Sequence, residues 1–364
     1  MSTNDLSRRK FLSHAAALTA GWALSDGRTL GAAPLNFSPV TPAPAPARAD
    51  LPLKILTTGN IPPEYAKKIT GLAPGIEIIT ARGAEEVAAK IAEADVFYGS
   101  PSARLIAAAK RLKWVQVGSA GVENYGFPEL VKGPIILTNS SGVYGSQISE
   151  HAIGLMLALT RGINRFIATK AWRVDDLKPI EISGMTMGIV GLGDIGSQIA
   201  RRAHYGFDMK ILATDPKPMR KPGFVAELRY PSWFMAMVPQ VDFLVSAAPH
   251  TRETEKMFNA KVFNAMKPTA YFIDISRGKL IDGPALIQAL KDQRIAGAGL
   301  DVTPEEPLPK DNPLWGFPNV IITGHTSGVC QYSDKRRMDL FTENVRRFVA
   351  GEPLLNVIDK EKGY

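Results

Sequence analysis

Met185-Thr186-Met187-Gly188-Ile189-Val190-Gly191-Leu192-Gly193-Asp194-Ile195-Gly196 is the stretch that decides how this chain folds. Residues 185–190 have the apolar pattern of a buried strand, and a helical pattern follows the glycines. In such a G-x-G-x-x-G turn, Gly191 permits the tight bend, Gly193 lets the backbone approach a pyrophosphate, and Gly196 lets helix and strand pack closely. The free N–H groups at the helix start would bind the phosphates. The stretch therefore predicts a dinucleotide site.

An acidic residue at the end of the next expected strand supports this interpretation. Asp215 follows the strand pattern of residues 210–213, about 20 residues beyond the glycines. Its carboxylate would hydrogen-bond a ribose 2′-hydroxyl and repel a 2′-phosphate, which favours NAD over NADP. Lys217 and Arg220 lie just beyond and could accommodate a 2′-phosphate. NAD is the expected cofactor, and NADP stays open.

Short apolar strands alternate with helical stretches on both sides of this turn. We expect a first series of strands at 53–56, 77–79, 96–98, 114–117 and 135–137, and a second at 185–190, 210–213, 242–245, 271–273, 298–302 and 320–322. A long apolar helix over 146–166 connects them, and a last helix over 333–350 follows the final strand. This alternation is typical of parallel sheets covered by helices on both faces. The sequence predicts an α/β fold of two doubly wound lobes with a cleft between them.

Length and composition reduce the range of possible functions. The chain has 364 residues, enough for about two domains of ~100–200 residues each. Its single cysteine, Cys330, excludes an intrachain disulfide and a Cys-based zinc site, and no metal site is expected. The net charge is +8, of which residues 1–49 contribute +3, and the remaining charge of about +5 is spread without long runs. Such a modest excess suits a small anionic substrate better than a nucleic acid.

The amino-terminal segment has the character of a targeting signal. Ser7-Arg8-Arg9-Lys10-Phe11-Leu12 resembles the twin-arginine export motif, and the apolar run after it is too short and too polar to anchor a membrane. A proline-rich tether follows at 39–46. Residues 1–49 are therefore expected to be an export signal and linker that the twin-arginine machinery recognises. That prediction places the mature chain in the periplasm without membrane insertion, whereas a merely disordered basic tail would leave it in the cytoplasm.

Three polar segments follow successive strands of the second series, where an open α/β sheet places its ligands. They are Asp274-Ile275-Ser276-Arg277-Gly278, the stretch Leu300 to Pro309, and Thr323-Gly324-His325-Thr326. Together with the glycine turn, they closely resemble the D-isomer-specific 2-hydroxyacid dehydrogenases, from about Leu53 to the carboxyl end. Further landmarks are Gly118-Ser119-Ala120-Gly121-Val122-Glu123, Thr138 to Val143, Glu150-His151, Pro249-His250-Thr251 with Thr254, and Pro313-Leu314-Trp315.

The resemblance implies a domain plan. A flavodoxin-like substrate domain would consist of residues 50–147 and 327–364, and a Rossmann domain of residues 148–326 would bind the dinucleotide. Closure of the two domains would exclude water during hydride transfer. The resemblance also implies a homodimer formed through the nucleotide lobe.

The resemblance implies three catalytic residues. Arg277 would bind the substrate carboxylate and polarise its carbonyl through a planar, permanently charged guanidinium. His325 would act as the acid/base, and Glu306 would fix its tautomer and stabilise the imidazolium. The substrate would be a small D-2-hydroxy acid or its 2-keto acid.

Further contacts follow from the same resemblance, and Asp301 among them would orient the nicotinamide carboxamide. The expected cofactor contacts are Gly191, Gly193, Asp194, Ile195, Gly196, Asp215, Pro249, Thr254, Ile275, Arg277, Asp301 and His325. The expected substrate contacts are Ser119, Ala120 and Gly121, by their backbone N–H groups, together with Arg277 and His325.

The chain departs from the family pattern at three places. Gly324 stands where proline usually precedes the histidine, Glu123 replaces an aspartate, and His250 replaces a leucine. Other residues are expected to be structural. They are His151, His204, Cys330 as a packed thiol, and Trp172 at a lobe or subunit boundary.

Two alternative functions stay open at this point. A phosphite-type dehydrogenase would keep the hydride chemistry with another donor, and Glu306 argues against formate because formate enzymes pair their histidine with glutamine. A non-catalytic NAD(H)-binding sensor or scaffold would use the same fold without turnover.

Overall fold

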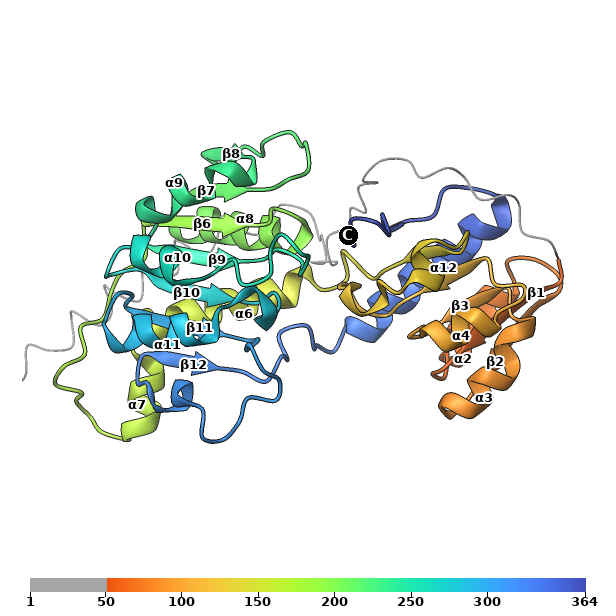
Figure 1. Cartoon of the computed structure of the whole chain (residues 1–364), viewed down its shortest axis with the longest axis horizontal. Helices are drawn as coiled ribbons and strands as arrows, with labels where there is room; N and C mark the ends of the chain where they lie inside the picture. Colours follow the sequence, from red (N-terminus) through yellow and green to blue (C-terminus); the bar gives the residue numbers. More distant parts are fainter. Residues whose placement is uncertain (1–50) are drawn as a thin grey trace, which may run out of the picture. The chain divides into compact units, whose positions relative to one another are not determined.

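The computed structural model describes residues 51–364, so the predicted export signal and linker lie outside the described residues. Within this range the chain forms two parallel β-sheets, one of five strands and one of seven (Figure 1). Both sheets are flanked by helices, so the predicted α/β class with two doubly wound lobes is confirmed.

The first sheet has the strand order β2-β1-β3-β4-β5, which is the flavodoxin-like order. Its strands are β1 (Leu53–Thr57), β2 (Ile76–Thr80), β3 (Val96–Tyr98), β4 (Trp114–Gln116) and β5 (Ile136–Thr138). The helices between them are α2 (Pro63–Thr70), α3 (Gly83–Lys90), α4 (Ala103–Ala108) and α5 (Pro128–Val131). Alternate strand residues point to opposite faces, so two apolar clusters form, one on each side of the sheet.

The second sheet has the order β12-β11-β10-β9-β6-β7-β8. Its strands are β6 (Thr186–Val190), β7 (Lys210–Thr214), β8 (Glu227–Arg229), β9 (Phe243–Ser246), β10 (Tyr271–Asp274), β11 (Gly297–Leu300) and β12 (Val320–Ile322). The strand order reverses between β6 and β9, and ligands of such sheets bind at this switch point. The glycine turn at 191–196 directly follows β6.

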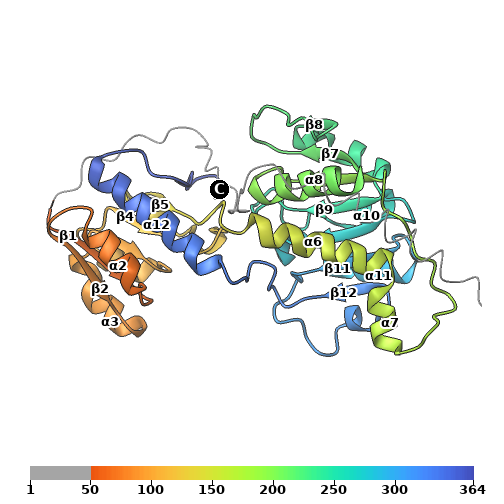
Figure 2. The same cartoon turned by 180° about the vertical axis from the view of Figure 1, so that it is seen from behind.

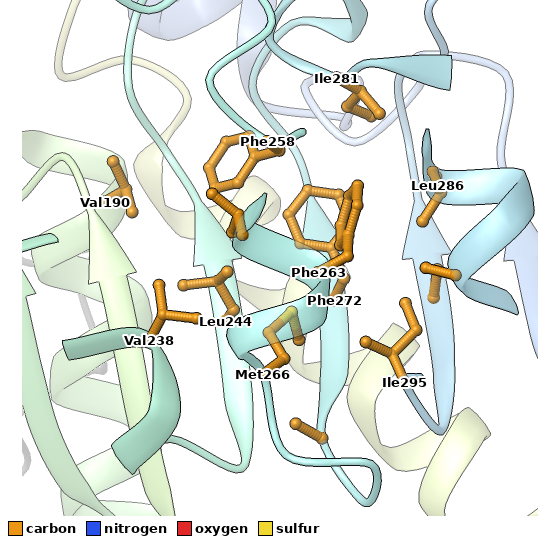
Figure 3. Close-up of a cluster of buried hydrophobic side chains, with 14 of the residues drawn as sticks. Val190, Val238, Leu244, Phe258, Phe263, Met266, Phe272, Ile281, Leu286 and Ile295 are labelled. Carbon is orange, nitrogen blue, oxygen red and sulfur yellow. The ribbon is translucent and has the colours of Figure 1, made fainter. Parts of the chain in front are cut away.

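Helices cover both faces of the second sheet. Helices α9 (Phe234–Met237), α10 (Ala260–Ala265) and α11 (Gly283–Lys291) lie over one face, in front in Figure 1. Phe263 and Leu286 of these helices pack with Phe272 in the cluster drawn in Figure 3. Helices α6 (Gly145–Thr160) and α8 (Asp194–Phe207) cover the opposite face, seen in Figure 2.

The long helix expected over 146–166 is broken in the structure, so that prediction was wrong in part. Helix α6 ends at Thr160, and a separate helix α7 (Ile163–Thr169) follows. Gly162 between them has φ +64°, in the left-handed region, and a Cβ atom there would lie 2.4 Å from Leu177. A glycine in this conformation ends a helix because it tolerates the positive φ.

The short edge strand β8 was not expected from the sequence, because Glu-Leu-Arg has neither an apolar run nor a clear alternation. The last helix, α12 (Ser333–Ala350), lies where it was predicted. It follows the second sheet in the chain but packs on the first, with Phe341, Val345 and Phe348 against Leu53 and Trp114.

Within residues 51–364 no helix combines the length and apolar character that a membrane span requires.

Candidate active site

The glycine turn after β6 has the close contacts that its sequence predicted. Gly191 has φ +91°, and a Cβ atom there would lie 2.7 Å from the carbonyl oxygen of Ala247. A Cβ on Gly196 would lie 2.0 Å from the Gly191 carbonyl oxygen. Gly193, by contrast, faces open space, with no heavy atom within 4 Å of the position of a Cβ. The turn is therefore closed where helix α8 meets the strand and open where a phosphate would approach.

Asp215 lies at the end of β7, and its carboxylate is held beside the glycine turn. One oxygen accepts a hydrogen bond from the backbone N–H of Leu192, and the other accepts from the N–H of Lys217, both at 2.8 Å. The neighbouring turn after β9 is also fixed, because the Thr254 hydroxyl donates to the Pro249 carbonyl at 2.7 Å. These residues line the carboxyl ends of strands around the switch point.

Three of the expected cofactor residues have side chains directed into the protein. Ile275 is buried in the same apolar cluster as α6 and α8, and Ile195 packs against that cluster. Asp194 accepts a hydrogen bond from Gln198 at 3.0 Å and lies against Gly145. Ile275 therefore has only its backbone to offer a cofactor.

Arg277 is presented by a turn after β10 that a buried carboxyl group holds. Asp274 is fully buried, and its Oδ1 accepts from the Ser276 N–H at 2.8 Å and from the Ser276 hydroxyl at 2.7 Å. The Ser276 and Ser246 hydroxyls are 2.7 Å apart. Burial raises the pKa of Asp274 to about 7, although the hydrogen bonds from Ser276 act in the opposite direction. The same turn accepts from Arg277, whose Nη1 donates to the Ser276 carbonyl at 2.7 Å.

His325 and Glu306 form a pair. Nδ1 of His325 lies 2.9 Å from Glu306 Oε2, and both side chains are partly exposed. The other Glu306 oxygen accepts from the Thr303 N–H at 3.2 Å. The carbonyl of Thr303 packs against Gly278, where a Cβ atom would come within 1.6 Å of it. A continuous set of contacts thus joins the turn of Arg277 to the imidazole of His325.

The backbone that carries His325 is held by Asp301, at the end of β11. The N–H of His325 donates to the Asp301 carbonyl at 2.8 Å, and His325 takes a left-handed conformation with φ +55°. The Asp301 carboxylate accepts from the N–H groups of Thr326 at 3.0 Å and Ser327 at 3.1 Å. Burial opposes the ionisation of Asp301, yet hydrogen bonds from Ser327 and Thr323 hold its pKa below the ordinary value.

His151 and Thr323 also belong to this network. The sequence places Thr323 within the polar segment of His325 and indicates a structural role for His151, but it does not predict their contact. The Thr323 hydroxyl donates to Asp301 Oδ1 at 2.6 Å and lies 2.8 Å from Nε2 of His151 on α6. An ionised carboxylate only accepts, so the single hydroxyl proton of Thr323 points to Asp301 and Nε2 of His151 must donate. The one available signal was a hydroxyl residue two positions before His325.

The expected substrate loop follows β4. The Ser119 hydroxyl donates to the Gly121 carbonyl at 2.7 Å, and the Ala120 carbonyl accepts from Asn139 at 2.5 Å. Gly121 lies directly against Arg277, because a Cβ atom there would be 1.9 Å from Nη2. The loop and the guanidinium therefore lie beside each other, although they are far apart in the sequence.

Among the described residues, no group of three His, Cys, Asp or Glu side chains is arranged to hold a metal ion.

Comparison with known proteins identifies the family that this chain resembles. Residues 153–327 match the model for the NAD-binding domain of the D-isomer specific 2-hydroxyacid dehydrogenases. A glyoxylate reductase from Korarchaeum cryptofilum is 34% identical over 267 residues, which are 71% of this chain and 80% of that protein. A D-3-phosphoglycerate dehydrogenase from Methanocaldococcus jannaschii is 32% identical over 84% of this chain, which spans 59% of that protein.

One solved structure is similar over most of its length. It is an NADPH-dependent glyoxylate/hydroxypyruvate reductase from Sinorhizobium meliloti in complex with NADP and malonate. Its identity to this chain is 27%, its TM-score is 0.70, and the match covers 85% of this chain and 98% of that one. With this family match, the glycine turn identifies an NAD(P) site in an oxidoreductase. The chain belongs to the D-isomer specific 2-hydroxyacid dehydrogenase family.

Proposed function

We propose that this enzyme interconverts a small D-2-hydroxy acid and its 2-keto acid, with His325 as the acid/base. The observation that carries the proposal is the His325–Glu306 pair at 2.9 Å, joined through Thr303 to the turn of Arg277. An acid/base, a carboxylate behind it and a nearby guanidinium are the groups that reduction of a 2-keto acid requires.

The residues present suit a bound dinucleotide. The open space over Gly193 would accept the pyrophosphate, and the N–H groups at the start of α8 would bind it. Asp215 and the turn of Pro249 and Thr254 would hold the adenosine part, and Asp301 the nicotinamide amide. When bound, NAD(P) supplies or accepts the hydride.

The side chains of this chain would provide proton transfer and charge stabilisation. Nδ1 of His325 is engaged by Glu306, so Nε2 is the nitrogen that exchanges a proton with the substrate oxygen. During reduction, Nε2–H protonates the oxygen as negative charge develops on it, and Glu306 stabilises the imidazolium. Arg277 donates hydrogen bonds to the substrate carboxylate and carbonyl, and the loop of Ser119 to Gly121 binds the carboxylate by its N–H groups.

A substrate screen tests the proposal. Glyoxylate, hydroxypyruvate and pyruvate are each supplied with NADH or NADPH, and oxidation of the cofactor is followed by absorbance. At least one acid is expected to be reduced, and His325→Ala to lower kcat/KM by about 10²–10⁴-fold. Glu306→Gln should also reduce turnover, whereas Glu305→Gln, a matched change at the preceding residue, should have little effect. Wild-type turnover in His325→Ala would refute the assigned mechanism.

We also propose NAD as the preferred cofactor. The Asp215 carboxylate, fixed by two backbone N–H groups, would repel a 2′-phosphate. Lys217 lies over the ring of Tyr364, at 4.7 Å from the ring centre, and burial lowers its pKa. This lysine is therefore engaged elsewhere and is less available to a 2′-phosphate.

A homodimer formed through the nucleotide lobe is a further proposal. Ile167 on α7 is 70% exposed and Trp172 just beyond it is 94% exposed, so Trp172 does not pack at a lobe boundary within the chain. Exposed apolar groups of this size are typical of an interface. Light scattering should give twice the chain mass, and Ile167→Asp with Trp172→Ser should give the monomer. A monomeric wild-type protein would contradict this proposal.

Export by the twin-arginine route is proposed from the sequence of residues 1–49 alone. Fractionation of a tagged full-length chain should place it in the periplasm, and Arg8→Lys with Arg9→Lys should retain it in the cytoplasm. Because this route carries folded proteins, the enzyme could be exported with its cofactor bound. If the wild type and the double-lysine variant are distributed equally between periplasm and cytoplasm, the proposed export signal is refuted.

A further inference from the structure

In the loop that would bind the substrate carboxylate, residues 118–121, every backbone carbonyl accepts a hydrogen bond from another part of the chain. The pairs are Gly118 with the Tyr144 hydroxyl, Ser119 with the Ser140 N–H at 2.9 Å, Ala120 with the Asn139 side-chain amide at 2.5 Å, and Gly121 with the Ser119 hydroxyl at 2.7 Å. Three of the four donors belong to residues 139–144, the segment that follows β5. That segment therefore holds the loop by its carbonyl groups.

The N–H groups of the same peptide units are left without a partner. Residues 119–122 carry these N–H groups, and within residues 51–364 none of them has a hydrogen-bond acceptor. A trans peptide unit is planar, with its N–H opposite its carbonyl, so a held carbonyl also fixes the direction of the N–H. Consecutive N–H groups of this kind bind anions.

A guanidinium lies at the end of this row of N–H groups. Nε of Arg277 donates to Glu123 Oε1 at 2.5 Å, and Nη1 donates to the Ser276 carbonyl at 2.7 Å. Nη2 has no acceptor within residues 51–364, and it lies 1.9 Å from the position of a Cβ on Gly121. The N–H of Gly121 belongs to the peptide unit whose carbonyl Asn139 holds. Asn139 thus controls the peptide unit next to the unoccupied nitrogen of the guanidinium.

The side chain of Asn139 is itself fixed on both sides. Its Oδ1 accepts from the Ser141 N–H at 3.0 Å, which leaves Nδ2 to donate to the Ala120 carbonyl. Its backbone N–H donates to the Asn356 carbonyl at 3.2 Å, and its backbone carbonyl accepts from Nε2 of Gln116 at 2.9 Å. Asn139 and Gln116 are both buried. The amide is therefore held in the orientation that reaches the loop.

We propose that Asn139, together with Tyr144, positions the loop so that its N–H groups bind the substrate carboxylate. Without these donors, the peptide units can turn their carbonyl oxygens toward the anion, and repulsion then replaces a hydrogen bond. Hydride transfer leaves the carboxylate unchanged, so the two residues act on substrate binding and not on the chemical step. This inference rests on the proposed reduction of 2-keto acids.

The main test is Asn139→Ala, which removes the donor without adding a charge. At saturating NADH, KM for glyoxylate should rise about tenfold with kcat near the wild-type value, because one hydrogen bond to a charged group is misdirected. Oxamate, an analogue of a 2-keto acid that is not reduced, serves as a binding probe. In a titration with NADH present, its dissociation constant should rise by about the same factor. The affinity for NADH alone should not change.

Two variants at other positions complete the comparison. Tyr144→Phe removes only the hydroxyl that Gly118 accepts, and it should raise KM for glyoxylate in the same way, by about threefold or more. Asn319→Ala is the matched control, since the amide of Asn319 also donates to a backbone carbonyl, that of Ala296 at 2.8 Å, next to β12 of the second sheet. It should leave both KM and the oxamate dissociation constant unchanged.

A purely structural role gives a different result. A variant that only loses stability has a lower kcat, in proportion to its folded fraction, and an unchanged KM. That result in Asn139→Ala or in Tyr144→Phe would overturn the inference, as would an equal rise of KM in Asn319→Ala. If the wild type reduces no 2-keto acid and the variants still weaken oxamate binding, the proposed function fails and the positioning role stands. Reduction of glyoxylate with an unchanged affinity for oxamate in both variants refutes the positioning role alone.

Discussion

Replacement of Asp274 by asparagine should make the stability of the protein less dependent on pH. Burial raises the pKa of Asp274 from 3.8 to about 7 in the folded chain. Between these values the unfolded chain has released the proton and the folded chain retains it, so the carboxyl group's contribution to stability falls as the pH rises. Above the folded value no further loss occurs.

The size of the effect follows from this window. At pH 5 the unfolded carboxyl group is already ionised. The interval from pH 5 to the folded pKa is about two pH units, over which the protein loses about 3 kcal/mol of stability. In Asp274→Asn the amide oxygen can still accept both hydrogen bonds from Ser276. Its NH₂ group replaces Oδ2, a buried atom without a partner among the described residues, at a pH-independent cost of about 1–3 kcal/mol.

Urea unfolding of both proteins at about pH 5 and about pH 8 measures the difference. The difference between the free energies of unfolding, wild type minus variant, should be about 3 kcal/mol smaller at pH 8 than at pH 5. Other titrating groups contribute equally to both proteins and cancel. A difference between the proteins that is the same at both pH values would refute the reasoning, because Asp274 would then not retain its proton in the folded chain.

Three further predictions concern the network, the helix break and the cofactor. Thr323→Val removes the hydroxyl between His151 and Asp301, so it should lower the free energy of unfolding by about 1–3 kcal/mol and reduce kcat/KM. Thr342→Val, at a buried hydroxyl without a partner among the described residues, should not destabilise, and equal losses in both variants would contradict this prediction. Gly162→Ala should destabilise by at least about 1 kcal/mol in a thermal melt, because of the positive φ and the contact with Leu177. Gly154→Ala, with open space around it, should be neutral or stabilising, and a melt in which the two variants behave alike would argue against strain at position 162. Asp215→Ser should shift the ratio of kcat/KM for NADH to that for NADPH toward NADPH by about tenfold or more, which steady-state kinetics would detect. An unshifted ratio would mean that Asp215 does not select the cofactor.

Local pattern was enough to predict much of the fold. The strands were recognisable because each is a short apolar run next to a glycine or polar turn, and the glycine turn at 191–196 indicated the dinucleotide site. The helix break at Gly162 was not recognisable, because one glycine in an apolar run is compatible with a continuous helix. Strand β8 is held by its pairing with β7 rather than by its own residues.

The side-chain contacts of the candidate site were only partly predictable. The pairing of Glu306 with His325 followed from the family resemblance, and the two residues are separated by 19 positions. The contact between Glu123 and Arg277 joins residues 154 positions apart, and that of His151 with Thr323 spans 172. Such contacts depend on the tertiary fold and have no local sequence signal.

The return of α12 to the first sheet has a consequence for the order in which the molecule can be completed. Phe341, Val345 and Phe348 close the apolar face that Leu53 and Trp114 present, so the lobe that is synthesised first is finished last. Until the ribosome has released the final turns, that face is open to solvent and to other chains. Loss of even the last thirty or so residues would therefore leave the earliest-made lobe without its covering helix, however complete its strands are.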